Sequence, residues 1–379
     1  MSRQFMWFLF GVLMAAVSVP AQAKTVGVGG CKPKIKNYPT ISAAVGDPAN
    51  AGATIQVCAA AGPGTGGSYP EQVTINQPLT LEGVTNGNSG RAVIGVPSGG
   101  PFPPNWTSII GQSVYAQVLV LAGPVSGPVN IINVTVDGTA GGIGCSATAG
   151  LVGIFYASGT SGTVNEATAR NQISSGCGTG IWAENGTAAT DSITIENSSV
   201  ENMDLQGVFA TSTQQPSTLQ VTIQGNSVTA STTPPTAGIV AIGSNGKIQN
   251  NVVTSGIYGI ESISSSTSVS SNVVADIRDS GNGYGLYLTP GAAAQNNNVS
   301  DADIAFYLAP GQAAGPTLQG NESMNSITSV EFNCDANATV LANRFTDSQK
   351  AFNDWPGTTP FTKNQFYDID TIPSMNQCP

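Results

Sequence analysis

Hydrophobic and polar residues alternate in short runs along most of this 379-residue chain. Around position 222, for example, Val221 and Ile223 are separated by one threonine, and Val228 follows after a polar stretch. An alternation with a period of two is typical of β-strands that bury one face. Gly, Pro, Asn and Ser separate the runs, as expected for turns. The pattern therefore predicts many short strands joined by turns rather than helices.

The runs recur as a unit built on the pattern apolar-x-x-Asn-x-apolar. The asparagine, or a serine in its place, stands at positions 171, 198, 226, 251, 272, 297, 321, 343 and 364. A second element, such as Gly180-Ile-Trp-Ala, lies between successive asparagines. Spacings in the twenties that vary only by insertion indicate a solenoid. The regular leucines and the helical half of a leucine-rich repeat are absent, so the repeat predicts an all-β parallel β-helix of roughly ten or more coils.

The repeated asparagine has a structural explanation. Asparagine tolerates a left-handed backbone and bonds locally, which suits a sharp bend between two strands. Stacked at the ~4.8 Å spacing of neighbouring strands, the side-chain amides of successive coils can bond to one another. We therefore expect Asn226 and its counterparts to form an asparagine ladder rather than a ligand site.

The first part of the chain has elements in a distinctive order. They are an alanine-rich helix at Thr40–Val45, a strand at Thr54–Val57, a turn at Gly67–Glu71 of sequence Gly-Ser-Tyr-Pro-Glu, and a strand at Val73–Ile75 followed by Leu-Thr-Leu-Glu-Gly. This order resembles the opening of pectin-lyase-like right-handed parallel β-helix proteins, and with the repeats the resemblance covers roughly residues 38 to 370. It implies a right-handed solenoid with a short N-terminal capping helix. It implies no single activity, because pectinesterases, pectate lyases, polygalacturonases, adhesins and inert surface proteins share the fold.

The N-terminus predicts a secretory signal peptide at residues 1–23. Arg3 precedes the apolar run Phe5–Val19, and Ala21-Gln-Ala23 is a small-residue cleavage site. The alternative is an uncleaved membrane anchor, but the run falls short of the ~20 residues of a span. We expect a secreted, extracellular protein, with the periplasm or the cell surface as alternatives, and no transmembrane segment after cleavage.

Residues 24–379 are expected to form one β-helix domain, because the repeat continues without a break. The N-terminal cap is expected near residues 38–46 and the C-terminal cap near residues 355–379. Residues 85–128, rich in Gly and Pro, are interpreted as long insertions on early coils.

The amino-acid composition limits the classes of molecule that the protein is expected to bind. Removing Arg3 with the signal leaves 11 basic residues against 22 acidic ones, a net charge of −11. Such a surface repels nucleic acid and anionic lipid, and it disfavours a strongly anionic glycan unless a metal ion bridges the contact. No nucleic-acid partner is expected, and we expect a monomer.

The six cysteines form an even set, as expected for disulfides in a secreted protein. Six cysteines allow 15 connectivities, which the sequence alone cannot separate. Coils of a solenoid touch only near neighbours, so we expect neighbouring cysteines to pair. The expected pairs are Cys31 with Cys58, Cys145 with Cys177, and Cys334 with Cys378.

The chain contains no histidine. This excludes Ser-His-Asp triads, histidine-based acid–base catalysis and histidine-ligated zinc. The residue clusters of polygalacturonase-like and pectinesterase-like enzymes are also absent. Whether the protein is an enzyme stays open, but catalysis would have to use carboxylates, as in a polysaccharide lyase or a glycoside hydrolase. No cofactor is required, and Ca²⁺ is the one candidate metal ion.

One group of charged residues is a candidate for such chemistry. Asp276, Arg278 and Asp279 precede Asp301 and Asp303 by one repeat, so the two sets should occupy similar loops on neighbouring coils. Carboxylates one or two coils apart fall in the ~5–10 Å range of glycosidase pairs. The group could bind calcium or act in catalysis. The alternative is a set of solvated turn aspartates, which turn propensity favours.

A row of outward residues is the second candidate. If the Ile of each Gly-Ile element points inward, the next residue points outward. That row reads Phe155, Trp182, Phe209, Val240, Glu261, Tyr287, Tyr307, Glu331 and Asn353, with Glu184 two residues after Trp182. Aromatic faces interleaved with carboxylates suit sugar rings. The alternative is that loops cover the row and the aromatic side chains pack beneath them.

These observations predict a secreted β-helix protein that binds an extracellular polysaccharide through the outward row, with cleavage left open. The competing hypothesis is a non-catalytic structural or adhesive rod at the cell surface.

Overall fold

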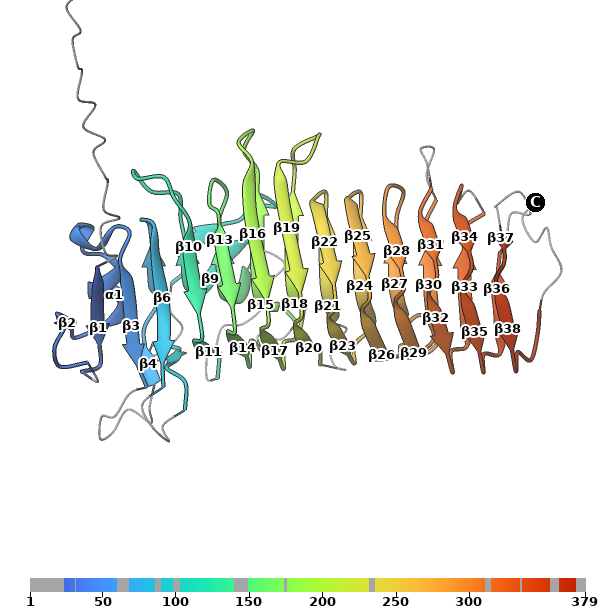
Figure 1. Ribbon diagram of the computed structural model, residues 1–379, viewed down its shortest axis with the longest axis horizontal. Coiled ribbons are helices and arrows are strands. Elements are labelled where there is room, and N and C mark those ends of the chain that lie inside the picture. Colours follow the sequence, from blue (N-terminus) through green and yellow to red (C-terminus); the bar gives the residue numbers. More distant parts are fainter. Residues whose placement is uncertain are drawn as a thin grey trace, which may run out of the picture.

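The computed structural model describes residues 24–30, 32–59, 68–85, 90–97, 103–139, 149–173, 176–231, 236–310, 315–334, 336–354 and 361–372. The chain winds into an elongated row of coils (Figure 1). Strands that follow one another in sequence fall into three different sheets, and within each sheet a strand pairs in parallel with its counterpart in the next coil. This arrangement is the parallel β-helix that the repeat predicts.

The three sheets are named here A, B and C. Sheet A contains β2 (Asn37–Tyr38), β1 (Thr25–Val28), β3 (Thr54–Cys58), β6 (Leu79–Val84), β10 (Val129–Ile132), β13 (Gly162–Asn165), β16 (Asp191–Glu196), β19 (Leu219–Gln224), β22 (Asn245–Gln249), β25 (Ser266–Ser270), β28 (Ala293–Gln295), β31 (Thr317–Gln319), β34 (Thr339–Leu341) and β37 (Phe361–Thr362). Sheet B contains β4 (Ser68–Pro70), β7 (Val93–Gly95), β11 (Thr135–Asp137), β14 (Thr168–Arg170), β17 (Ser199–Glu201), β20 (Ser227–Thr229), β23 (Val252–Thr254), β26 (Val273–Ile277), β29 (Asn298–Ala302), β32 (Glu322–Met324), β35 (Arg344–Thr346) and β38 (Gln365–Tyr367). Sheet C contains β5 (Val73–Ile75), β9 (Ser113–Val120), β12 (Ala149–Tyr156), β15 (Gly178–Asn185), β18 (Gln206–Ser212), β21 (Ala237–Ile242), β24 (Tyr258–Ile263), β27 (Tyr284–Leu288), β30 (Ile304–Leu308), β33 (Thr328–Phe332) and β36 (Lys350–Asn353).

Helix α1 (Ile41–Val45) lies at the N-terminal end of the row of coils, followed by a short 3₁₀ helix at Pro48–Asn50 (Figure 1). The Thr40 side chain caps α1 by accepting from the Ala43 N–H. The carboxylate of Glu71 accepts from the backbone N–H groups of Ile41 and Ser42, at 2.9 and 2.8 Å. Both contacts satisfy amides that a helix start leaves unpaired. The predicted capping helix is confirmed. Glu71, the last residue of the predicted turn, binds the first backbone N–H groups of this helix.

The asparagine ladder is confirmed from Asn226 to Asn364. Each Oδ1 accepts from the backbone N–H and the side-chain amide of the asparagine one coil before, as Asn272 does from Asn251 at 3.0 and 2.9 Å. Each side-chain amide also donates to a backbone carbonyl, that of Ile248 for Asn272. Every buried polar atom of the rung is therefore paired, which low-dielectric surroundings require.

The backbone of the ladder corrects one expectation. The left-handed residue is not the ladder asparagine but the residue before it, as at Asn250, Ser271 and Ala342, whose φ angles are 56°, 55° and 56°. The reason is steric and directional. The ladder side chain must point inward to stack, so the preceding residue makes the bend and takes the left-handed conformation.

Two segments differ in detail from the sequence interpretation. Residues 85–128 contain the coil strands β7 and β9, with a further stretch between them. That stretch carries β8 (Trp106–Thr107), which pairs antiparallel with β9. Near the other end, residues 361–367 add strands to sheets A and B, while 355–360 and 373–379 lie outside the described residues.

Cys58, Cys177 and Cys334 are disulfide-bonded. The partners expected for them, Cys31, Cys145 and Cys378, lie outside the described residues, so the pairing stays a prediction. The same holds for the signal peptide at residues 1–23. Within the part of the chain that the structure describes, no helix has the length and apolar character needed to cross a bilayer.

Candidate functional site

The outward row on sheet C exists in the predicted register. From Phe155 to Asn353, each residue of the row pairs across the parallel strands with the next residue of the row, one coil further along. The residues directly before Glu261, Tyr287, Tyr307 and Glu331, such as Ile260 and Leu286, are completely buried in the core. Alternation therefore places the row on the outer side of the sheet. The two halves of the row nevertheless have different surroundings.

The N-terminal half of the row is covered. Phe155, Trp182, Phe209 and Val240 form an apolar cluster outside the coil, and none is more than 4% exposed. The Trp182 ring lies 5.2 Å from that of Phe155 and 4.9 Å from that of Phe209, between centroids. No ligand can reach these side chains, which corrects their expected role in glycan binding. The alternative, in which the aromatic residues pack beneath a cover, holds for this half.

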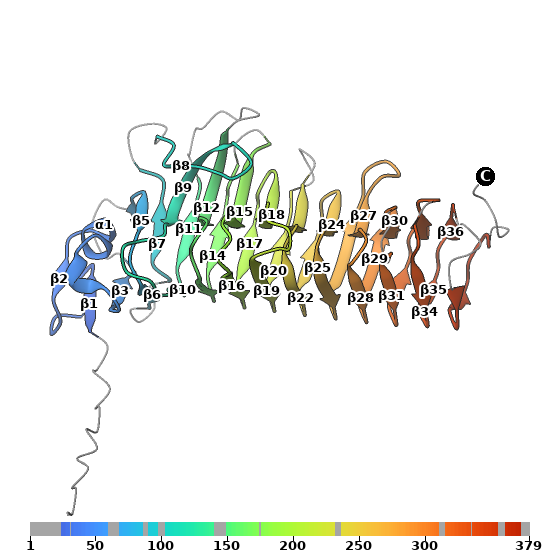
Figure 2. The same cartoon turned by 90° about the horizontal axis from the view of Figure 1, so that it is seen from above.

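The cover is residues 103–112, which include β8 and lie along the outer side of the molecule beside β9 (Figure 2). Asn105 fixes it by bonding to both backbone groups of Ala116 at 3.0 Å. Trp106 Nε1 and the Ile109 N–H donate to the two carboxylate oxygens of Glu184, at 2.9 and 3.0 Å. Burial raises the pKa of Glu184 to about 7, although these two donors lower it. Glu184 is thus a buried tether for the cover and not a ligand contact.

The C-terminal half of the row is open and half-buried. Its exposed surface contains Tyr258, Tyr284, Tyr287 and Tyr307 with Glu261 and Glu331, a set called here the tyrosine strip. Tyr258 and Tyr284 were not in the predicted row. Each directly precedes the glycine of a Gly-Ile or Gly-Leu element. That glycine has no partner in the pairing between β24 and β27, so the tyrosine side chain lies on the outer side of the sheet. The repeated Tyr-Gly pair was the available sequence signal.

The tyrosine rings stand against one another along the strip. Tyr258 stacks on Tyr284 at 5.5 Å and 15°, and Tyr287 stacks on Tyr307 at 4.8 Å and 19°. Tyr284 meets Tyr307 edge-on at 5.1 Å, which joins the two pairs. Stacked faces are turned toward each other, so the strip offers ring edges, hydroxyl groups and outer end faces. This differs from the row of flat open faces that the sequence suggested.

Two carboxyl groups flank the tyrosines. Burial raises the pKa of Glu261 to about 7, and its side chain makes no hydrogen bond to any described residue. Burial and the charge of Asp354 also raise the pKa of Glu331, against the effects of Asn353 and Lys350. Glu261 and Glu331 are three ladder steps apart, or about 14 Å. That exceeds the ~5–10 Å of glycosidase pairs, so the two cannot act as one.

The predicted aspartate group turns out to hold a loop. Asp303 is 3% exposed, and its Oδ2 accepts from the backbone N–H groups of Asp279, Gly281 and Gly283 at 2.6, 3.0 and 3.0 Å. The Arg278 guanidinium pairs with Asp303 Oδ1 at 3.5 Å. Burial raises the pKa of Asp303, but these donors outweigh it and hold the pKa below its ordinary value. Asp303 therefore anchors the connection of the preceding coil.

Asp276 and Asp301 occupy equivalent corners of neighbouring coils. Both have left-handed backbones, with φ of 60° and 54°, as asparagine does at the corresponding Asn325. Turn geometry explains these aspartates, as the alternative interpretation proposed. Among the described residues no three acidic or cysteine side chains converge to hold a metal ion. Calcium binding stays a prediction.

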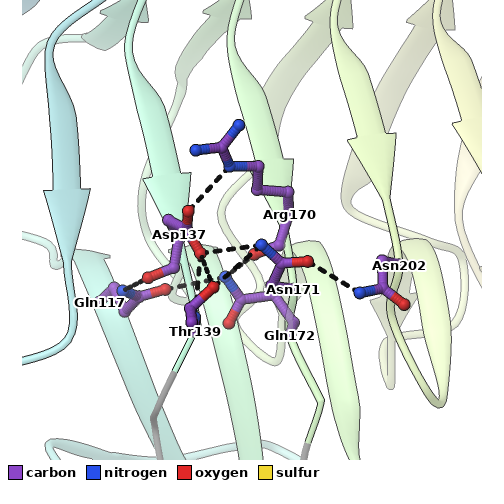
Figure 3. Close-up of polar contacts among 7 residues, drawn as sticks. All are labelled: Gln117, Asp137, Thr139, Arg170, Asn171, Gln172 and Asn202. Carbon is purple, nitrogen blue, oxygen red and sulfur yellow. Dashed lines mark hydrogen bonds and ion pairs between the residues drawn. The ribbon is translucent and has the colours of Figure 1, made fainter.

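A second charged network joins sheets B and C near the covered half (Figure 3). Asp137 Oδ2 accepts from Arg170 Nε at 2.8 Å, and Oδ1 accepts from Asn171 Nδ2 at 3.0 Å. Asn202 Nδ2 extends the network by donating to Asn171 Oδ1 at 2.7 Å (Figure 3). Burial raises the pKa of Asp137, but Thr139, Asn171 and Arg170 together hold the pKa below its ordinary value. The Arg170 side chain therefore links neighbouring coils through its ion pair with Asp137.

A cavity of about 390 Å³ lies apart from the tyrosine strip. Its walls come from the connections between sheets C and A in the first coils, including Pro78, Leu121 and Gly159. Its one acidic wall residue, Asp191, already accepts from the Gly159 N–H at 2.7 Å.

Comparison with known proteins agrees with this architecture. Residues 206–366 match the family model for the right-handed β-helix region. The fold is a right-handed parallel β-helix. No curated protein sequence matches the chain.

Solved structures share the fold at low sequence identity. The GH136 lacto-N-biosidase from Eubacterium ramulus is 9% identical, with a TM-score of 0.55 over 92% of this chain and 67% of that one. The A-module of the mannuronan C-5 epimerase AlgE4 from Azotobacter vinelandii is 13% identical, with a TM-score of 0.43 over 89% of this chain and 93% of that one. The likeness to the lacto-N-biosidase shows the fold alone.

Proposed function

We propose that this protein binds an extracellular polysaccharide along the tyrosine strip. The observation that carries the proposal is the open half of sheet C, where four stacked tyrosines lie beside two half-buried carboxyl groups. Tyrosine combines a large apolar ring with a hydroxyl group, and sugars need both C–H contacts and hydrogen bonds. A solved structure that shares the fold is a lacto-N-biosidase, which supports a carbohydrate ligand.

Glu261 supports the proposal independently of the tyrosines. Its carboxyl group is half-buried and unpaired among the described residues, in a protein whose other buried carboxylates, such as Asp303 and Glu184, are saturated with donors. An unsatisfied polar group in a partly desolvated site is costly unless something bonds to it. Hydroxyl groups of a bound sugar would supply those bonds.

Secretion belongs to the same proposal. A predicted signal peptide at residues 1–23 and three disulfide-bonded cysteines, Cys58, Cys177 and Cys334, both suit an oxidising compartment outside the cytosol. A polysaccharide of the extracellular matrix or a cell wall would be met there. We propose binding rather than cleavage, because the two strip carboxyls are too far apart to act as a glycosidase pair.

The test is a binding screen with matched variants. Soluble uncharged and acidic polysaccharides are run in affinity electrophoresis with the wild type, with Tyr287→Ala/Tyr307→Ala, and with Tyr367→Ala. Tyr367 is a 46% exposed tyrosine on sheet B, away from the strip. We expect the double variant to lose at least about tenfold in affinity, or ~1.4 kcal/mol, and Tyr367→Ala to bind as the wild type does.

Two outcomes contradict the proposal. Equal affinity of the double variant and the wild type would place binding elsewhere on the molecule. A wild type that binds no polysaccharide would favour the alternative of a structural or adhesive rod. Reducing ends and 4,5-unsaturated products, measured in the same samples, would reveal cleavage.

A further inference from the structure

Cationic side chains are almost absent around the tyrosine strip. The strands β24, β27, β30, β33 and β36, together with the connections that flank them, contain only Arg278 and Lys350 as cationic residues. The same stretch contains Glu261, Glu331, Asp279 and Asp303 among its acidic residues. The strip is therefore acidic even within an acidic protein.

Arg278 is already engaged, and Lys350 lies beside a carboxyl of the strip. Arg278 donates to the backbone carbonyls of Ala302 and Asn325, at 3.2 and 3.3 Å, and pairs with Asp303. Lys350 lies close enough to Glu331 to lower the pKa of that carboxyl. Recognition of a carboxylate normally uses an Arg or Lys that is free to pair with it, and the one exposed cation beside the strip, Lys350, already has the carboxylate of Glu331 beside it.

The carboxylates of Glu261 and Glu331 repel a negatively charged ligand. Glu261 faces Tyr258 and Tyr287, and Glu331 lies beyond Tyr307 in the same row. An extended chain that lies on the tyrosines would pass both carboxyls, because they sit at the two ends of the row. Like charges brought together in a partly desolvated groove repel strongly, and the one cation beside the strip, Lys350, is itself offset by Glu331.

We propose that the tyrosine strip takes an uncharged polysaccharide, and that Glu261 and Glu331 exclude chains that carry uronic acid residues. This inference rests on the proposed function and adds the substrate class to it. The carboxyls bond to sugar hydroxyl groups when the chain is neutral, and they repel it when the chain carries carboxylates. Specificity then comes from a repulsive element as well as an attractive one.

The test uses pairs of polysaccharides that differ only in charge. β-Glucan and galactomannan are compared with forms whose primary hydroxyl groups have been oxidised to carboxylates. Polygalacturonate and mannuronan are compared with their carboxyl-reduced forms. Affinities are measured at pH 8 with EDTA present, so that the strip carboxyls are ionised and no metal ion bridges the charges.

In every pair that the wild type binds, we expect the uncharged member to bind at least about tenfold more tightly. Glu261→Gln/Glu331→Gln should keep the affinity for the uncharged member within about threefold and bring the charged member close to it. Glu322→Gln removes a carboxylate from sheet B, where Glu322 faces Arg344 at 3.6 Å, and should leave the discrimination unchanged.

Each contrary outcome has its own meaning. Equal or tighter binding of a charged member by the wild type overturns the substrate class while leaving the proposed function intact. Unchanged discrimination in the double glutamine variant overturns the role of Glu261 and Glu331, provided its unfolding midpoint matches the wild type. Absence of binding to all eight polysaccharides means that the proposed function itself has failed.

Discussion

At the scale of the residue, neighbouring positions of one bend have separate tasks. Asn272 points inward and its side chain bonds two backbone groups of the preceding coil, while Ser271 before it takes the left-handed conformation that turns the chain. The first task needs a side chain with both a donor and an acceptor. The second needs only tolerance of a positive φ, which Asn, Ser and even Ala342 supply at different coils. The ladder position is therefore the more demanding of the two.

Substitution of one ladder residue should be costly. Asn272→Ala removes the side-chain partners of the buried Asn251 backbone N–H and of the Ile248 carbonyl, so we expect a loss of about 3 kcal/mol in the free energy of unfolding. Guanidinium unfolding and exchange of the Asn251 N–H would measure it. Asn298→Ala, at an exposed asparagine one residue after a ladder position, is the control and should cost less than ~0.5 kcal/mol. A similar small loss for Asn272→Ala would refute the ladder's contribution.

At the scale of the element, the cover with β8 divides sheet C into a closed and an open half. Its contacts run from Trp106 and Ile109 to Glu184, about two coils further along the chain. The charge of Glu184 matters to this packing. Because its folded pKa is about 7, above the ordinary 4.5, the folded state holds this proton more tightly than the unfolded state.

A pH dependence of stability follows from Glu184. The free energy of unfolding should fall as the pH rises from about 4.5 to about 7 and then level off, by on the order of 1 to 3 kcal/mol. Glu184→Gln should reduce that fall, whatever its effect on absolute stability, and Glu201→Gln at an exposed site should not. Unfolding midpoints at pH 5, 6, 7 and 8 give the slopes. A slope in Glu184→Gln equal to that of the wild type would show that Glu184 does not titrate in this window.

The elements also show which features the sequence could predict. The ladder, the three strands of each coil and the outward row follow from local periodicity. The structure has the ladder at the repeat positions from Asn226 onward, whereas Asn171 forms a left-handed corner instead. The cover could not be predicted in this way, because Trp106 reaches Glu184 by a long-range contact that no periodicity encodes. Without the cover, Trp182 and Tyr287 look alike in sequence, although one is buried and the other half-exposed.

The aspartates illustrate a second limit of the sequence. Asp276 and Asp303 are the same residue type and both lie in turn-rich segments, so composition cannot separate them. Only the three-dimensional contacts reveal that Asp303 receives three backbone N–H groups while Asp276 forms a left-handed corner.

At the scale of the whole molecule, the protein is an elongated solenoid whose two ends of sheet C differ. The coils before β24 carry a buried aromatic cluster beneath the cover, and the coils from β24 onward expose the tyrosine strip. The ladder and the shared apolar core hold these coils in one continuous stack, so the strip keeps its spacing without a ligand. A rigid, acidic, tyrosine-lined surface of this length suits an extended and uncharged polymer.

The most direct test of this account is hydroxyl-radical footprinting of tyrosine side chains with and without a bound uncharged polysaccharide. The account predicts that labelling of Tyr284, Tyr287 and Tyr307 falls several-fold on binding, while labelling of Tyr367 on sheet B does not change. Unchanged labelling of the strip, or protection confined to Leu121 and Val125 at the cavity between sheets C and A, would contradict it.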